Sequence, residues 1–289
     1  MNLTAWIGLA VMVVSQTATL ARIEPFWSWN TPIAWTGFIL FADGIVWRAR
    51  RNSWIRSNGR ELVFLALASI PLWLVFEGYN RLIRNWYYTG LPENFALRMF
   101  GYAWSFATIW PAIFEGTELI AVLRAGRAGK AGRENPPVLP ALPAHPAFSI
   151  AAGGVMLALP FLVPPAIATY MAAPVWLGFI FLLDPLNARL GGESLLADLR
   201  AGQWDRLINL ALSGLLCGVL WEFWNYWAGA KWHYTVPIME NLKVFEMPLP
   251  GYLGFPAFAL ECFTMYVFVR VVVANVTKAR GQLGRTIAL

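Results

Sequence analysis

Charged residues are scarce in this sequence, and their scarcity is the first guide to its class. Asp, Glu, Lys and Arg together make up 13% of the 289 residues, and hydrophobic residues make up 58%. A soluble domain typically has about 25% charged and about 45–50% apolar residues. The composition therefore argues against a soluble globular protein and for a chain that lies in a membrane.

Histidine and cysteine are also rare, with two of each. His145 and His233 have no cysteine or carboxylate cluster at ligand spacing, so we expect no metal site. Cys217 and Cys262 lie in apolar segments, where a thiol usually packs as a small apolar group. The sequence also lacks a Walker motif, Gly-x-Gly-x-x-Gly and Gly-x-Ser-x-Gly. We therefore expect no cofactor and find no support for nucleotide or serine-hydrolase chemistry.

Long apolar stretches are what the sequence has instead. A membrane-spanning helix needs about 20 mostly apolar residues. The stretch at residues 146–183 is too long for one span and contains internal prolines, which predicts two helices joined by a turn. We expect an all-α integral membrane protein with eight transmembrane helices. They lie at residues 1–21, 32–47, 62–76, 99–114, 146–183 (two helices), 207–221 and 247–269.

Lys and Arg are divided unevenly between alternate loops. Of the 22 basic residues, sixteen fall on the side that includes residues 48–60, 124–133 and 189–206. By the positive-inside rule this side is cytoplasmic, so both termini should lie in the cytoplasm and the protein in the cell inner membrane. Because the basic residues are confined to loops between spans, we expect no nucleic-acid partner.

Five short matches recur in the same order in the two halves of the chain. They predict two tandem four-helix repeats of the same orientation, related by an axis along the membrane normal. The first repeat is residues 1–123, the second is residues 148–289, and residues 124–147 form a cytoplasmic Gly/Arg-rich and then Pro-rich linker. The matches are WTGFILFAD (35–43) with WLGFIFLLD (176–184), FEGYN (76–80) with WEFWN (221–225), WYYT (86–89) with WHYT (232–235), EN (93–94) with EN (240–241), and GY (101–102) with GY (251–252).

The polar residues that both halves keep are candidates for function. Glu77 and Asn80, like Glu222 and Asn225, are three residues apart, which puts acid and amide on one helix face. Each pair could hold a proton, an ion or a ligand group between its two side chains. Alternatively, each pair forms hydrogen bonds to the loop that follows and fixes its Trp-x-Tyr-Thr turn.

A second set of candidates surrounds the second-half pair. Glu261 lies in the middle of the last span, where it is either a proton donor or a neutral acid bonded to a neighbouring helix. Trp224, Trp227, Trp232 and Tyr234 either line a pocket for an apolar or polyene ligand or belong to the interfacial aromatic belt.

Three motifs of the second half, WHYTVP (232–237), FEMPLPG (245–251) and PAFALE (256–261), resemble the small integral-membrane lycopene cyclases of the heterodimer-derived type. A single Glu261 stands here where that family has an adjacent Glu-Glu pair. The resemblance implies tandem membrane repeats and protonation of a polyene end without a metal or a redox change. It assigns roles to Trp232, Thr235 and Glu261.

Our leading hypothesis is a membrane enzyme that acts on a hydrophobic isoprenoid or lipid by acid–base chemistry. Glu222, Asn225 and Glu261 would form its site, and Glu77 and Asn80 its degenerate twin. One alternative is an ion- or proton-coupled transporter that uses Asp43, Glu77, Asp184 and Glu222. Another is a non-catalytic subunit that binds other membrane proteins.

The orientation predicts which loops react with reagents outside the cell. A cysteine introduced at Arg56 should stay unlabelled by an impermeant maleimide added to intact cells, because this loop is expected on the cytoplasmic face. A cysteine at Glu93, in an expected outer loop, serves as the positive control. Labelling at Arg56 from outside would contradict the orientation.

Overall fold

The structure is a computed structural model that describes residues 1–128 and 145–277. It is mostly helical, and five of its helices are long and apolar enough to cross a membrane. This supports the expected all-α, multi-pass membrane protein at the level of length and composition. The five are α1 (Leu3–Leu20), α4 (Gly59–Ile83), α5 (Phe95–Ala128), α10 (Asp205–Trp227) and α11 (Gly254–Val276), the last preceded by the 3-10 helix η1 (Leu249–Leu253).

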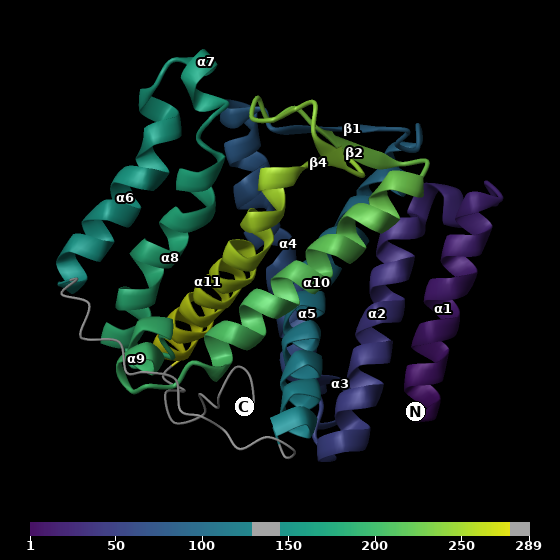
Figure 1. The fold of residues 1–289 in the computed structure, drawn as a ribbon, viewed down its shortest axis with the longest axis horizontal. Helices are drawn as coiled ribbons and strands as arrows, with labels where there is room; N and C mark the ends of the chain where they lie inside the picture. The colour runs from purple at the N-terminus through teal and green to yellow at the C-terminus, as the bar shows by residue number, and fades with distance from the viewer. Residues whose placement is uncertain (129–144, 278–289) are drawn as a thin grey trace.

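Three further helices pack among these five. They are α2 (Phe26–Arg50), α6 (Pro146–Leu162) and α8 (Ala172–Arg189). The last two confirm that the apolar stretch at residues 146–183 folds as two helices, joined through the short helix α7 (Pro165–Ala168). Together with α2, helices α6 and α8 bring the number of long helices in the described residues to eight. That all eight cross the membrane stays a prediction. In Figure 1 the long helices run between two ends of the molecule.

The expected linker is shorter than the sequence indicated. Helix α5 continues to Ala128 and α6 begins at Pro146, so both ends of residues 124–147 are helical. The remainder of the expected linker, residues 129–144, lies outside the described residues.

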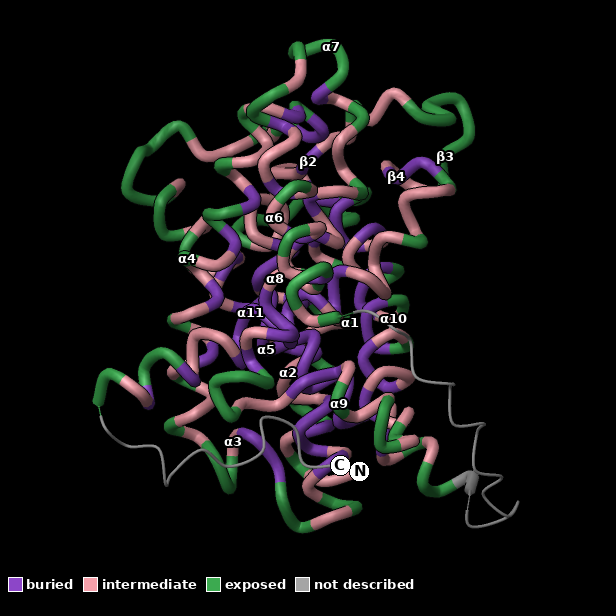
Figure 2. Tube along the Cα trace, turned by 90° about the vertical axis from the view of Figure 1, so that its left-hand side faces the viewer, coloured by how far each residue is buried: buried purple, intermediate pink, exposed green. Residues whose placement is uncertain are grey.

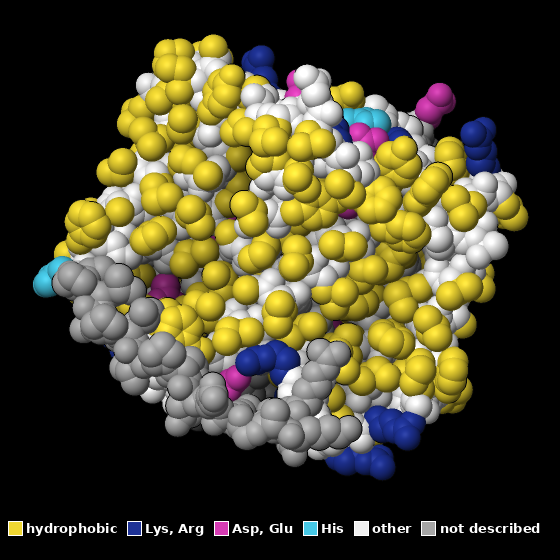
Figure 3. Space-filling view, viewed as in Figure 1, with side chains coloured by type: hydrophobic (Ala, Val, Ile, Leu, Met, Phe, Trp, Pro, Cys, Tyr) yellow, Lys and Arg dark blue, Asp and Glu magenta, His cyan; other side chains and the backbone are white. Residues whose placement is uncertain are grey.

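Apolar side chains cover much of the lateral surface. In Figure 3 hydrophobic residues fill the middle of the visible face, and charged side chains gather toward its upper and lower ends. The buried residues lie along the centre, where α2, α5, α10 and α11 meet (Figure 2). Large exposed apolar residues occur on the outer helices, including Trp6, Leu67, Phe148, Val155 and Leu212. Such a surface is what a lipid environment requires.

Small residues let two helix pairs approach closely. A Cβ added at Gly8 of α1 would lie 2.3 Å from the backbone nitrogen of Phe41 in α2. A Cβ added at Gly153 of α6 would lie 2.4 Å from the nitrogen of Leu182 in α8. Close backbone contact at glycine is a usual way for membrane helices to pack.

Asp43 and Asp184 each hold a short helix against the end of a long one. Asp184 in α8 accepts hydrogen bonds from Ser194 Oγ and Leu195 N, both at 2.7 Å, at the start of α9 (Leu195–Arg200). Asp43 in α2 accepts one from Ile55 N at 2.9 Å, in α3 (Trp54–Ser57). Both aspartates therefore satisfy backbone donors at helix N-termini.

Two small antiparallel sheets interrupt the helical pattern, which the sequence did not predict. Strand β1 (Trp86–Thr89) pairs with β2 (Lys231–Tyr234) at the end of the molecule opposite α3 and α9 (Figure 1). The register places Tyr87 opposite His233, with Trp86 opposite Tyr234. A shorter pair, β3 (Lys243–Val244) with β4 (Met247–Pro248), lies before η1.

Candidate functional site

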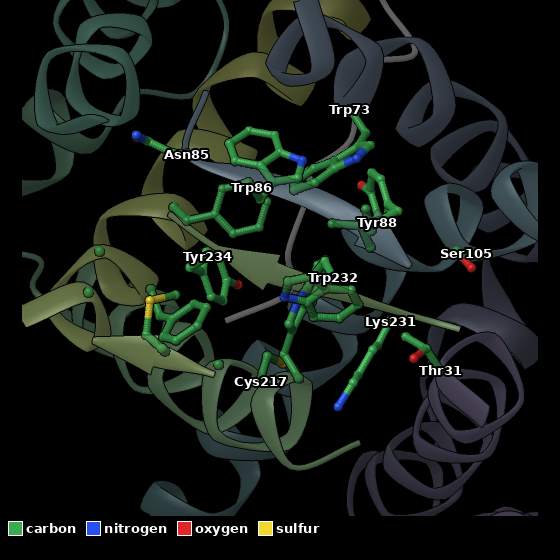
Figure 4. Close-up of a pocket in the computed structure, with 18 of the residues that line it drawn as sticks. Thr31, Trp73, Asn85, Trp86, Tyr88, Ser105, Cys217, Lys231, Trp232 and Tyr234 are labelled. Carbon is green, nitrogen blue, oxygen red and sulfur yellow. The ribbon is translucent and has the colours of Figure 1, made fainter. Parts of the chain in front are cut away.

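A cavity of ≈ 490 Å³ lies beside the β1–β2 sheet. Its wall is largely aromatic and is contributed by α2, α4, α5, α8, α10, α11 and both strands (Figure 4). Helices and strands far apart in sequence therefore meet around one space. The aromatic lining residues are Trp29, Trp35, Trp73, Trp86, Tyr88, Tyr102, Phe106, Tyr170, Trp176, Trp221, Trp232, Tyr234, Phe255 and Phe258.

Contacts between rings fix this wall. Trp221 lies 5.2 Å from Trp232 and 5.7 Å from Trp73, measured between ring centroids. Trp176 lies 5.2 Å from Phe258, edge to face. Each such pair is worth about 0.5–1.5 kcal/mol beyond the area it buries. Ring packing between helices and strands therefore fixes much of the wall.

Two tyrosines connect the cavity to the glutamates behind its wall. The Tyr88 hydroxyl donates to Glu77 Oε1 at 2.6 Å, and the Tyr234 hydroxyl donates to Glu222 Oε1 at 2.9 Å. Burial, followed by the neighbouring glutamate charge, raises the pKa of both tyrosines well above the ordinary value. Both phenols therefore stay protonated at neutral pH and act as hydrogen-bond donors.

The two glutamates differ in how many donors they accept. Glu77 Oε1 also receives the indole N–H groups of Trp73 at 2.9 Å and Trp86 at 3.2 Å. Glu222 is fully buried, and its Oε2 has no hydrogen-bond partner among the described residues. Glu222 can thus accept a further hydrogen bond, whereas Glu77 already accepts hydrogen bonds from two indoles.

Asn80 and Asn225 hold the first tryptophan of each strand. Asn225 Nδ2 donates to the Trp232 carbonyl and its Oδ1 accepts from the Trp232 N–H, both at 2.9 Å. Asn80 does the same to Trp86, at 2.8 and 3.2 Å. The amide thus replaces the backbone partners that these residues would otherwise lack.

Comparisons with models of known protein families, with curated proteins and with solved structures find no match.

Among the predicted substrate-binding residues, Trp232 and Tyr234 line the cavity. Trp224 is buried behind it, 4.8 Å from the Trp35 ring. Trp227 lies at the end of α10 with 41% of its surface exposed, and the exposed Thr235 donates to the Arg84 carbonyl at 2.6 Å. These three residues do not line the cavity, since they face other helices or solvent.

The predicted catalytic residues do not line the cavity either. Glu77 and Glu222 accept hydrogen bonds from the lining tyrosines, and Asn80 and Asn225 bond the strand backbone. All four therefore fix the segment that follows their helix, which is the loop-fixing alternative that the sequence left open. Glu261 lies about one helical turn beyond Phe258, the last residue of α11 that lines the space. It is fully buried, and neither carboxyl oxygen has a hydrogen-bond partner in the described part of the chain.

Sequence reasoning missed most of the wall, including Trp35, Trp176, Trp73 and Phe258. One signal was present, because the match of WTGFILFAD with WLGFIFLLD begins at Trp35 and Trp176. That these two residues line one cavity depends on how the halves dock, which no local pattern reveals.

The asparagine contacts predict a large stability cost for their removal. Asn225→Ala leaves the Trp232 N–H and C=O buried without partners, at about 1–3 kcal/mol per orphaned group. We expect a clearly lower denaturation midpoint in detergent. Asn241→Ala, at an exposed loop position, is the control and should match the wild type. An unchanged midpoint for Asn225→Ala would refute the contact.

Proposed function

We propose that this multi-pass membrane protein binds the hydrophobic part of an isoprenoid or another lipid in the aromatic cavity. The cavity itself carries the proposal. Its volume of ≈ 490 Å³ falls in the range of about 300–1,000 Å³ typical of small-molecule sites, which are mostly apolar with a few placed polar groups. The resemblance to lycopene cyclases independently favours an isoprenoid.

We also propose that the chain consists of two tandem four-helix repeats with eight spans, and that the cavity lies at their interface. The β1–β2 register supports this, because a two-fold axis between Tyr87 and His233 relates Trp86 to Trp232 and Tyr88 to Tyr234. Asn80 and Asn225 make matching contacts with their own strands, and Asp43 and Asp184 make matching contacts with their own short helices. Both pairs give the same correspondence between the halves.

An acid–base step, if the protein is an enzyme, is assigned to the Glu222–Tyr234 pair. Tyr234 faces the cavity but is too weak an acid to give up its proton alone. To protonate a bound ligand, Tyr234 would give its hydroxyl proton to the ligand and take one from protonated Glu222, and to accept a proton from the ligand it would pass its own proton to the Glu222 carboxylate. Glu77 is the poorer candidate, because three donors already hold it.

The transporter alternative is less well supported than binding. Two of its four acids, Asp43 and Asp184, hold short helices and do not line the cavity. The remaining two, Glu77 and Glu222, contact the strand tyrosines.

The binding proposal predicts that a hydrophobic molecule co-purifies with the protein. Mass spectrometry of solvent extracts should detect it with the wild type and with Trp227→Ala, which removes an exposed tryptophan from α10 outside the cavity. Trp221→Ala, which opens the wall on the same helix, should lose it. Ala173→Phe, which fills the space without removing a contact, should also lose it. Equal lipid in all four proteins would exclude this cavity as the binding site.

The acid–base assignment predicts that replacing Glu222 by glutamine affects conversion of the lipid but not its binding. Glu222→Gln keeps an acceptor for Tyr234 but cannot supply a proton, so it should retain the bound lipid and abolish its conversion in cells that lack the wild-type gene. Glu77→Gln should do less, and Glu261→Gln, which lies beyond the cavity, should convert normally. Normal conversion by Glu222→Gln would leave a binding protein without acid–base chemistry.

A further inference from the structure

The two ends of the cavity differ in chemistry. One end, here called the basic end, is formed by Ser28 and Thr31 of α2, Arg98 and Ser105 of α5, and Lys231 of β2. The other, the apolar end, is formed by Ala172, Ala173 and Leu177 of α8, Pro250 and Leu253 of η1, and Phe255 of α11. Asn85 and Tyr170 add polar but uncharged groups on the apolar side.

Packing around the start of α2 brings the basic end together. The Trp29 ring lies 5.5 Å from the Phe100 ring, which sets the first turns of α5 against α2. On the other side, Gly229 N donates to the Trp27 carbonyl at 2.9 Å, just before β2 begins. Arg98 and Lys231 therefore flank the same stretch of α2, and Figure 4 shows Lys231, Thr31 and Trp232 in one region of the cavity.

Arg98 and Lys231 are the only charged residues among the described residues that line the cavity. The Arg98 guanidinium lies 5.9 Å from the Phe95 ring and has no carboxylate within 4.0 Å in the described part of the chain. Lys231 Nζ lies 3.6 Å from Glu246, which is shared with His233 at 3.0 Å. Glu24, which accepts from the Ser28 hydroxyl, is exposed. Lys231 Nζ also donates to the Tyr226 carbonyl at 3.2 Å, so Arg98 is the less compensated of the two cations. Because neither glutamate lines the cavity, the charge facing it is positive.

Buried donors without acceptors lie on the same part of the wall. The indole N–H groups of Trp29, Trp35 and Trp232 and the hydroxyl of Thr31 have no hydrogen-bond partner among residues 1–128 and 145–277. Thr31 and Trp232 are 9% exposed and Trp35 is 1% exposed. An indole N–H can only donate, and a buried donor without an acceptor is costly. These donor atoms are closed to the cavity as well as to solvent, so the cations carry the chemistry of this end.

We propose that the ligand is an anionic amphiphile, with a phosphate or carboxylate headgroup at the basic end and its hydrocarbon tail at the apolar end. This inference rests on the proposed function and narrows its ligand class. Arg98 and Lys231 supply the charge complement, and the lining residues Ser28 and Ser105 add polar groups beside them. A pure hydrocarbon would leave the Arg98 charge without a counter-charge at this end, so it fits poorly.

Ligands with one tail and different headgroups test the proposal directly. Geranylgeranyl phosphate, geranylgeranoic acid and geranylgeraniol are titrated into the delipidated full-length protein in neutral detergent, with quenching of tryptophan fluorescence as the measurement. We expect at least one anion to bind about tenfold or more tighter than the alcohol, as a charge-assisted hydrogen bond provides. The advantage should shrink as salt is raised. Preference for the phosphate or for the acid identifies which headgroup the site takes.

Matched variants assign the effect to the basic end. Arg98→Gln and Lys231→Gln should each remove most of the anion preference and leave binding of the alcohol unchanged. The controls are Arg81→Gln and Lys243→Gln, which change exposed cations that do not line the cavity. Equal melting temperatures will show that all four variants are folded.

The outcomes separate this inference from the proposed function. If the alcohol binds as tightly as both anions, the anionic headgroup is refuted and the binding function stands. The same holds if Arg98→Gln and Lys231→Gln both keep the full preference. If none of the three ligands binds and no lipid co-purifies, the proposed function itself fails.

Discussion

The antiparallel pairing of β1 with β2 is the interaction on which the cavity depends. Side chains of a strand alternate between its two faces. Trp86 and Tyr88 therefore share the face that lines the cavity, as do Trp232 and Tyr234, while Tyr87 and His233 stack on each other at 5.4 Å between ring centroids. A one-residue slip of either strand would move its two lining residues away from the cavity.

The acids and amides behind the strands make that register unique. The buried Asn225 side chain accepts from the Trp232 N–H and donates to the Trp232 carbonyl. These two bonds can form at one position of the strand and at no other. Glu222 then fixes the Tyr234 ring through its hydroxyl. Polar groups that are costly to bury in an apolar environment thus serve to orient the strands. Among the described residues, Glu222 Oε2 is left without a hydrogen-bond partner.

The sequence predicts the helices better than the site, for a physical reason. Apolar length locates the spans, and the i,i+3 spacing of Glu77 with Asn80 correctly puts both on one helix face. Spacing cannot say what covers that face. Here the following strand covers it, so the acids lie behind Tyr88 and Tyr234 instead of lining the cavity. The strands were missed because four aromatic residues after a span equally suit an interfacial belt.

Differences between the proposed repeats make the two ends of the cavity chemically different. A cavity built from two identical halves would accept a ligand in either orientation. Lys231 precedes Trp232 where Asn85 precedes Trp86, and Thr31 lies four residues before Trp35 where Ala172 lies four before Trp176. Both substitutions place the more polar group on one side. The proposed two-fold axis relates Trp86 to Trp232 and Tyr88 to Tyr234, so the two ends of the wall differ in charge and polarity rather than in these aromatic residues. Divergence at so few positions is sufficient to orient an amphiphile without altering the fold that holds it.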